Sequence, residues 1–315
     1  MIGVVGGGAF GTALAVTLAR DGSDVVLWTR DKNSFAGGVM ARLLGVELPG
    51  NVSVTANIND LLVADPLLVA VPMQALTGFL NLHGARMHGR VLVACCKGVD
   101  LVTGRGATAV ISAACPTAKP ALLTGPSFAA DIARGLPTAL TIACTDDALG
   151  EKLQRCLSTA ALRLYRSTDV IGAELGGALK NVIAIASGVV MGAGLGESAR
   201  AALMTRGYAE MQRYAMASGA RAETLAGLSG LGDLVLTCTS DQSRNFRYGR
   251  ALGAGLSFDP GMTVEGVATA KAVSALALKR CIEMPIATMV AALVENSITL
   301  PQAIQALLSR PLKQE

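Results

Sequence analysis

The chain has 315 residues, of which 51% are hydrophobic and 3% aromatic, and its 27 basic and 23 acidic residues give a formal net charge of +4. No run of Lys or Arg interleaves with aromatic residues, so the composition does not support a nucleic-acid partner. Seven cysteines without C-x-x-C spacing fit reduced core residues of a cytoplasmic protein, and with only two histidines no metal site is predicted.

The first predicted elements are a short strand, a glycine turn and a helix. Apolar residues 2–5 precede Gly6-x-Gly8-x-x-Gly11, and residues 12–20 have helical composition. This is the context that the dinucleotide-binding fingerprint requires. Its glycines permit a tight turn, a close approach of the backbone to a pyrophosphate, and close packing of the helix on the sheet. The alternative is an ordinary strand-to-helix turn.

The next predicted strand, residues 24–28, ends close to two charged residues, Arg30 and Asp31. In such a fold this strand end binds the adenosine ribose. An acid would accept the 2′-hydroxyl of NAD, whereas Arg30 could pair with the 2′-phosphate of NADP. We therefore expect NADP or NAD as cofactor, with NADPH favoured by Arg30 and NAD left open by Asp31.

Further apolar runs alternate with helix-like segments up to about residue 168 and predict a mostly parallel, doubly wound α/β sheet of the Rossmann type. The later strands are expected at residues 52–54, 67–71, 91–94, 121–123, 138–143 and 162–165. From residue 169 helical periodicity takes over, with helices at 170–191, 199–218, 264–280, 286–296 and 300–308. We expect a dinucleotide-binding domain of residues 1–168 and an all-helical substrate and dimerisation domain of residues 169–315. The uncharged run 181–196 is too short to span a membrane.

Lys180 is the only charged residue between Glu174 and Glu197. Burial among Ala, Gly, Val, Ile and Leu should lower the pKa of its ammonium group towards neutrality, unless a partner compensates the charge. A lysine that titrates there can give and take the proton of a carbonyl/alcohol pair. The alternative is a lysine whose ammonium reaches the surface.

Other polar residues follow predicted strands or lie in the glycine-punctuated stretch 228–249, which we expect to be a connection between helices. Lys97 and the turn at 125–127 should lie near the cofactor crevice of the sheet. Asp233 could partner either lysine. The donors that would suit a phosphate are Ser243, Arg244 and Asn245. For all of these residues an ordinary loop or surface role is the alternative.

Several motifs occur in one order along the chain: Gly6-x-Gly8-x-x-Gly11-Thr-Ala-Leu-Ala, Val71-Pro-x-Gln-Ala-Leu76, Lys97-Gly98, Gly125-Pro-Ser-Phe-Ala129, Leu179-Lys-Asn-Val182, Leu231-Gly-Asp-Leu-Val-Leu-Thr-Cys238 and Ser243-Arg-Asn245. Over nearly its whole length the chain resembles bacterial NAD(P)-dependent sn-glycerol-3-phosphate dehydrogenase. The resemblance implies a cytoplasmic homodimer that reduces dihydroxyacetone phosphate to sn-glycerol 3-phosphate, the precursor of glycerophospholipids. Hydride would come from NAD(P)H, with Lys180 as general acid and base.

The resemblance also implies the remaining site residues. The substrate would contact Lys97, Gly125, Ser127, Asp233, Ser243, Arg244 and Asn245. The cofactor would contact Gly6, Gly8, Ala9, Phe10, Gly11, Arg30, Lys97, Ala129, Arg244 and Glu265. Residues 31–49 depart from the Arg- and Asn-rich pattern of the family, so we assign no contact to that loop.

Two other functions fit the same broad pattern. One is a two-domain dehydrogenase that acts on a hydroxy acid or a sugar acid. The other is a cofactor-binding sensor without turnover, although a sensor needs no proton donor such as Lys180.

Overall fold

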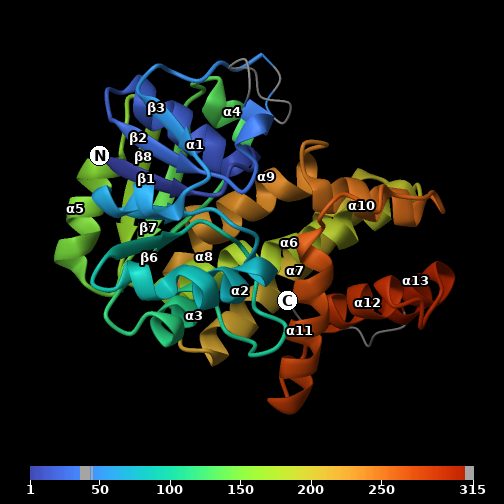
Figure 1. The fold of residues 1–315 in the computed structure, drawn as a ribbon. Coiled ribbons are helices and arrows are strands. Elements are labelled where there is room, and N and C mark those ends of the chain that lie inside the picture. The colour runs from blue at the N-terminus through green and yellow to red at the C-terminus, as the bar shows by residue number, and fades with distance from the viewer. Residues whose placement is uncertain (36–42, 44, 309–315) are drawn as a thin grey trace.

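The computed structural model describes residues 1–35, 43 and 45–308, and it has a sheet-based part followed by a helical part (Figure 1). The sheet has the strand order β3-β2-β1-β4-β5-β6-β7-β8. The strands are β1 (Ile2–Val5), β2 (Val25–Trp28), β3 (Val52–Thr55), β4 (Leu67–Val69), β5 (Val91–Ala94), β6 (Lys119–Thr124), β7 (Thr138–Ala143) and β8 (Leu162–Ser167). The order of the first five strands is that of a doubly wound nucleotide-binding sheet, so the predicted fold class is confirmed.

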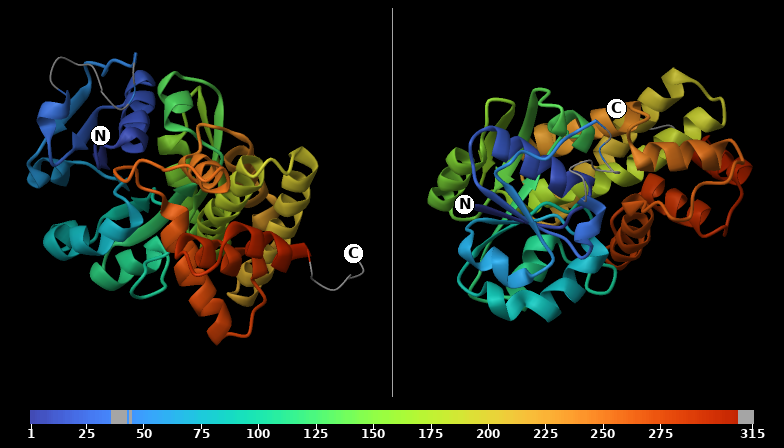
Figure 2. Two further views of the ribbon diagram at one scale, coloured as in Figure 1. Left: turned by 90° about the vertical axis from the view of Figure 1, so that its right-hand side faces the viewer. Right: turned by 45° about the horizontal axis from the view of Figure 1, so that its top comes forward.

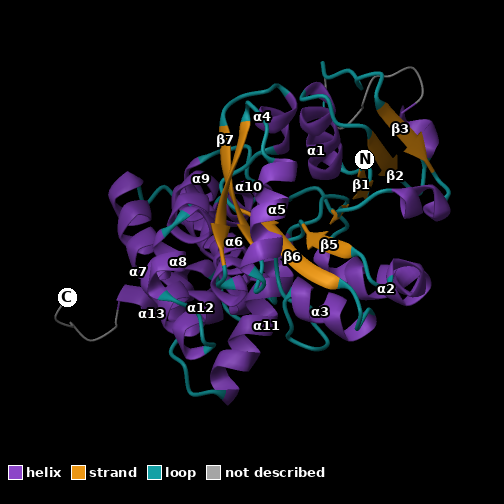
Figure 3. Ribbon diagram, turned by 90° about the vertical axis from the view of Figure 1, so that its left-hand side faces the viewer, coloured by secondary structure: helices purple, strands orange, loops and turns teal. Residues whose placement is uncertain are grey.

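The strands are apolar because helices cover both faces of the sheet. β1, β2 and β4 are buried along their whole lengths. The helices are α1 (Ala9–Arg20), α2 (Met73–His83), α3 (Ala107–Ala114), α4 (Ala129–Ala133) and α5 (Asp147–Leu157). Helices α1, α4 and α5 pack on one face and α2 and α3 on the other. Figure 3 shows helices flanking β5, β6 and β7.

One strand pair departs from a uniformly parallel sheet. β7 runs antiparallel to β6, and β8 is parallel to β7. The connection between β6 and β7 contains only the five-residue α4. A helix this short does not carry the chain back along the length of β6, so β7 runs in the opposite direction to β6.

The helical part is built around α6 (Val170–Gly192). It continues with α7 (Glu197–Ala217), α8 (Ala222–Ala226), the π-helical turn η4 (Leu228–Gly232), α9 (Asp233–Thr239), α10 (Arg244–Gly253), α11 (Glu265–Lys279), α12 (Pro285–Val294) and α13 (Leu300–Leu308). Helix α6 is long and apolar enough to cross a membrane, but 89% of its most apolar 18-residue stretch is buried inside the protein. It contacts α7, α9, α10 and α11, so its apolar surface forms the core of this part.

Helices α11, α12 and α13 lie on the side of the molecule away from β1, β2 and β3 (Figure 2). The last strand ends at Ser167, and the side chain of Asp169 accepts a hydrogen bond from the N–H of Gly172 to begin α6. This change from strands to helices lies close to the expected one. The assignment of residues 1–168 and 169–315 as two domains stays a prediction.

One local prediction was wrong. The stretch 228–249 is mainly helical, because Asp233 begins α9 and the side chain of Ser243 caps α10. Of the two histidines, His83 is the last residue of α2. Its ring lies 5.8 Å from the ring of Trp28, which explains how a histidine is accommodated against the sheet.

Candidate active site

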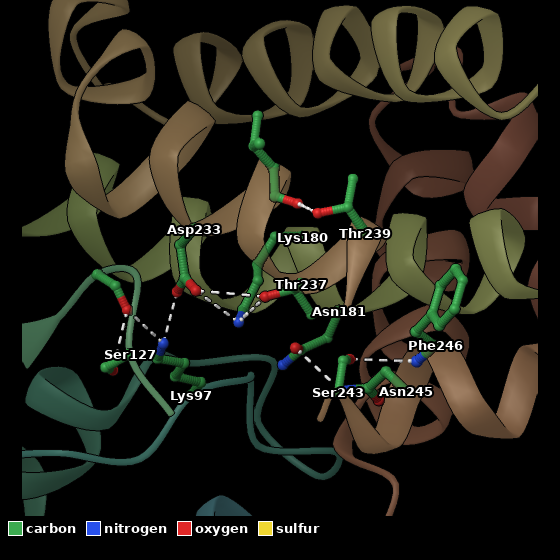
Figure 4. Close-up of polar contacts among 12 residues, drawn as sticks. Lys97, Ser127, Lys180, Asn181, Asp233, Thr237, Thr239, Ser243, Asn245 and Phe246 are labelled. Atoms are coloured by element: carbon green, nitrogen blue, oxygen red, sulfur yellow. Dashed lines mark hydrogen bonds and ion pairs between the residues drawn. The ribbon is translucent and has the colours of Figure 1, made fainter. Parts of the chain in front are cut away.

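Lys180 lies inside the molecule, as the apolar sequence around it predicted. Its side chain is 7% exposed, and its Nζ donates to Asp233 Oδ1 at 2.8 Å and to Thr237 Oγ1 at 2.6 Å (Figure 4). Burial lowers the pKa of Lys180 to about 8, while the negative charge of Asp233 partly opposes this shift and the positive charge of Lys97 adds to it. The alternative of a surface lysine is therefore wrong, and Lys180 titrates near neutral pH.

Asp233 joins the two lysines. Its side chain is fully buried at the start of α9, and its second oxygen, Oδ2, lies 2.5 Å from Lys97 Nζ. Lys97 follows β5, whereas Lys180 lies on α6, so one carboxylate connects the sheet to the helical part. A buried carboxylate shared by two ammonium groups keeps both in a fixed position.

The turn after β6 supplies a further acceptor to this cluster. Gly125 has a φ of +133°, a conformation that other residues rarely adopt. Its carbonyl oxygen accepts hydrogen bonds from Lys97 Nζ at 2.9 Å and from Ser127 Oγ at 3.2 Å. The structure thus brings Lys97, Gly125 and Ser127 together, while their place beside the cofactor crevice stays a prediction.

The proposed phosphate donors lie at the N-terminus of α10. Ser243 Oγ accepts the N–H of Phe246 at 3.2 Å, and Asn245 Nδ2 donates to Asn181 Oδ1 at 3.0 Å. The side chain of Arg244 is exposed and makes no hydrogen bond or ion pair with a described residue. A helix N-terminus with an adjacent guanidinium group favours an anion.

Sequence reasoning gave no role to two residues of this cluster, Thr237 and Asn181. Both lie within the motifs quoted above. Their spacing from Asp233 and Lys180 was the signal that could have identified them. Thr237 is four residues after Asp233 on α9, and its hydroxyl donates to Asp233 Oδ1 at 3.3 Å. Asn181 directly follows Lys180 on α6 and holds Asn245.

The glycine turn after β1 has the form of a phosphate cradle. Gly6 has a φ of +114°, and a Cβ added at Gly11 would lie 2.2 Å from the carbonyl oxygen of Gly6. A Cβ at Gly8 would meet nothing within 4 Å, so this side of the turn is open. Helix α1 begins at Ala9, earlier than predicted, and Phe10 is its second residue. No side chain caps its N-terminus. Its first N–H groups are thus suited to the pyrophosphate of a dinucleotide.

The end of β2 presents Arg30 to solvent. Its guanidinium group makes no hydrogen bond or ion pair with a described residue. Asp31 Oδ1 instead accepts the N–H of Asn33 at 2.9 Å at the start of the turn η1 (Lys32–Phe35). The carboxylate of Asp31 is therefore engaged locally. Residues 36–42 and 44 of the divergent loop lie outside the described residues.

Glu265 and Ala129 are the remaining predicted cofactor residues. Glu265 begins α11, and burial raises its pKa, while the positive charges of Arg244, Lys97 and Lys180 oppose the shift. Its carboxylate therefore faces the same cluster of cations. Ala129 begins α4, close behind the turn at Gly125. Within the described residues no group of His, Cys, Asp and Glu is arranged to hold a metal ion.

Comparison with known proteins agrees with this geometry. Residues 1–150 match the family described as NAD-dependent glycerol-3-phosphate dehydrogenase N-terminus, and residues 169–305 match its C-terminus. The chain belongs to the NAD-dependent glycerol-3-phosphate dehydrogenase family. The resemblance inferred from the motifs is therefore confirmed.

Similar proteins extend over the whole chain. A glycerol-3-phosphate dehydrogenase [NAD(P)+] of Cereibacter sphaeroides is 70% identical over 100% of both chains. One of Paracoccus denitrificans is 60% identical over 100% of this chain and 99% of its own. The crystal structure of glycerol-3-phosphate dehydrogenase from Coxiella burnetii superposes with a TM-score of 0.93 at 36% identity, covering 98% of each chain. The protein is accordingly an NAD(P)-dependent dehydrogenase, which excludes the sensor without turnover.

Proposed function

We propose that the protein reduces dihydroxyacetone phosphate to sn-glycerol 3-phosphate with NAD(P)H, and that Lys180 is the general acid and base. The observation that supports this most strongly is the buried Lys180–Asp233–Lys97 cluster beside the N-terminus of α10. A ketone beside Lys180 and a phosphate beside α10 match the two ends of this substrate. The names of two similar proteins, both glycerol-3-phosphate dehydrogenase [NAD(P)+], support the same substrate.

Lys180 holds the proton that the reaction needs. In its charged form it donates a proton to the oxygen of the developing alkoxide, and in its neutral form it accepts that proton in the reverse direction. Thr237 and Asp233 accept hydrogen bonds from Nζ and so orient the ammonium group. Lys97 adds a second positive charge that stabilises negative charge on the substrate oxygen.

The N-terminus of α10 would bind the phosphate. Arg244 supplies a guanidinium group and Asn245 is held in place through Asn181 and the N–H of Gly266. Fixing the phosphate places the ketone at a constant position relative to Lys180. Charge-assisted hydrogen bonds from Arg244 would distinguish this substrate from its unphosphorylated analogue.

The cofactor residues fit a dinucleotide, which when bound supplies the hydride. Gly6, Gly8 and Gly11 form the cradle. The guanidinium group of Arg30, which bonds to no residue that the structure describes, lies beside an engaged Asp31 and favours NADPH over NADH. We also propose that the protein is a cytoplasmic homodimer that supplies glycerol phosphate for phospholipid synthesis, as the family resemblance implies.

The test is oxidation of NADPH, and separately of NADH, by the purified protein with dihydroxyacetone phosphate. Unphosphorylated dihydroxyacetone is the control. Rapid oxidation with the phosphorylated ketone alone is the expected result. Absence of oxidation with both cofactors, in protein shown to bind NADPH, would overturn the proposal and favour a hydroxy acid or sugar acid as substrate.

A further inference from the structure

The motif Val71-Pro-x-Gln-Ala-Leu76 has no role in the proposed reaction, but it begins α2 beside the loop that carries Lys97. Pro72 precedes the helix with a φ of −57°, a value to which its ring restricts it. Met73, the first residue of α2, is 2% exposed, and its Sδ lies 3.9 Å from Cys96 Sγ. The first turn of α2 therefore packs directly against the residues that follow β5.

Gln74, the second residue of α2, makes two hydrogen bonds with the loop. Its Nε2 donates to the carbonyl oxygen of Val99 at 2.8 Å, and its Oε1 accepts the N–H of Leu101 at 3.2 Å. A side-chain amide has both a donor and an acceptor, so one glutamine binds both backbone groups. Gln74 is exposed, so hydrophobic burial does not account for its place in the motif.

The loop depends on these bonds because its first residues have few others. The backbone of residues 97–99 makes no hydrogen bond with the backbone of another described residue. From Asp100 onward the loop closes on itself. The N–H of Asp100 donates to the carbonyl oxygen of Arg105 at 2.9 Å, and the N–H of Gly104 donates to that of Asp100 at 2.8 Å. Gln74 has one bond before this closed turn and one within it, and so joins the two segments.

The helical part supports the loop from its other side. The side chain of Val99 is 3% exposed and belongs to the hydrophobic core around α6. A Cβ at Gly98 would lie 3.4 Å from Thr269 Oγ1 on α11 and 3.7 Å from Met73 Cβ on α2, so the backbone passes between these helices. The loop thus has an apolar support from the helical part and a polar support, Gln74, from the sheet-based part.

Lys97 begins this loop, so the position of its ammonium group depends on both supports. Its side chain is 14% exposed, and its Nζ lies 2.5 Å from Asp233 Oδ2 (Figure 4). Burial lowers the pKa of Lys180, the charge of Asp233 opposes this shift, and the charge of Lys97 adds to it. A loop that moves would carry the Lys97 charge away for part of the time, and the pKa of Lys180 would rise.

We propose that Gln74 is a positioning residue, which holds the loop of residues 97–101 so that Lys97 stays beside Asp233. It acts on the reaction through the loop and not by contact with the substrate. The effect on turnover rests on the proposed function, whereas the effect on the loop does not.

The kinetic test compares Gln74→Met with the wild-type protein in the reduction of dihydroxyacetone phosphate by NADPH. Methionine is a good helix former of similar length, but it lacks the N–H donor and the amide oxygen. The pH at which kcat falls should move upward, in the same direction as for Lys97→Met and by less. In a Lys97→Met background Gln74→Met should cause no further shift, because the charge that it positions is absent.

Gln154→Met is the matched control. Gln154 on α5 also donates from its Nε2 to a backbone carbonyl oxygen at 2.8 Å, that of Leu164 on β8. Its replacement removes a bond of the same kind and should leave the pH profile unchanged. An equal shift in Gln154→Met would show that the profile responds to lost stability and would overturn the proposal.

Amide hydrogen exchange tests the loop without turnover. The N–H of Leu101 should exchange about fivefold faster in Gln74→Met, because it loses its hydrogen bond, and at the wild-type rate in Gln154→Met. If the wild-type protein does not reduce dihydroxyacetone phosphate, the proposed function fails, while exchange still decides whether Gln74 holds the loop. An unchanged exchange rate, an unmoved pH profile, or an equal shift in the Lys97→Met background would each overturn the proposal.

Discussion

Asp233 and Lys180 form an ion pair in the interior, with 2.8 Å between Oδ1 and Nζ and side-chain exposures of 0% and 7%. The charges of this group do not balance, because a second ammonium group, that of Lys97, shares the same carboxylate. Two buried cations on one anion lower the cost of losing a proton from Lys180, and its pKa lies at about 8.

The two directions of the reaction should depend on pH in opposite ways. Reduction of the ketone needs the charged form of Lys180, so its rate should fall as the pH rises through about 8. Oxidation of the alcohol needs the neutral form, so its rate should rise through the same pH. Measured kcat profiles for both directions test this, and two profiles that change in the same direction would contradict it.

Lys180→Met should lower kcat by about two to four orders of magnitude, because it removes the proton donor. Binding of NADPH should be nearly unchanged. The protein should still fold, since Lys97 remains to pair with Asp233. Lys271→Met on α11 is a control, because that lysine pairs with Glu295 in a half-exposed ion pair. A Lys180→Met enzyme with nearly normal kcat would remove Lys180 from the proposed role.

Asp233 and Lys97 are the two charged groups that act on the pKa of Lys180. Replacing one or the other should move the pH profile in opposite directions. Asp233→Asn removes the charge that raises the pKa of Lys180, so reduction should lose activity at a lower pH. Lys97→Met removes the like charge, so the loss should occur at a higher pH. Asp233→Asn should also destabilise the protein by about 3–5 kcal/mol, because two buried cations lose their partner. Shifts of the same sign would contradict the electrostatic account.

Sequence patterns identified the sheet, the glycine turn and Lys180 because these features depend on local periodicity and burial. The uncharged surroundings of Lys180 were sufficient to place it in the interior. The sequence offered either lysine as the partner of Asp233. That one carboxylate joins both lysines, 53 and 136 residues away, was not encoded in any local pattern. The reversed direction of β7 and the helical form of residues 228–249 also depended on tertiary packing, since a glycine-rich polar stretch ordinarily indicates a loop.

Arg30→Ala should raise KM for NADPH about tenfold, because a charge-assisted hydrogen bond to the 2′-phosphate is lost. KM for NADH should change little, since NADH lacks that phosphate. Lys32→Ala is a suitable control, because it removes an exposed positive charge two residues further along the chain. An equal effect of Arg30→Ala on both cofactors would show that Arg30 does not bind the 2′-phosphate.

Gly249→Ala should impair the phosphate site from a distance. Helix α10 packs against α6 so closely that a Cβ at Gly249 would lie 2.0 Å from the carbonyl oxygen of Ile185. The two backbones must separate, at a cost of about 1–3 kcal/mol, and this moves the N-terminus of α10 with Arg244. We expect a lower thermal midpoint and a higher KM for dihydroxyacetone phosphate, with KM for NADPH less affected. Gly78→Ala is the matched control: Gly78 lies within α2, a Cβ there would meet nothing within 4 Å, and alanine should stabilise the helix. Equal thermal midpoints for the two variants would show that the contact between α6 and α10 does not depend on glycine.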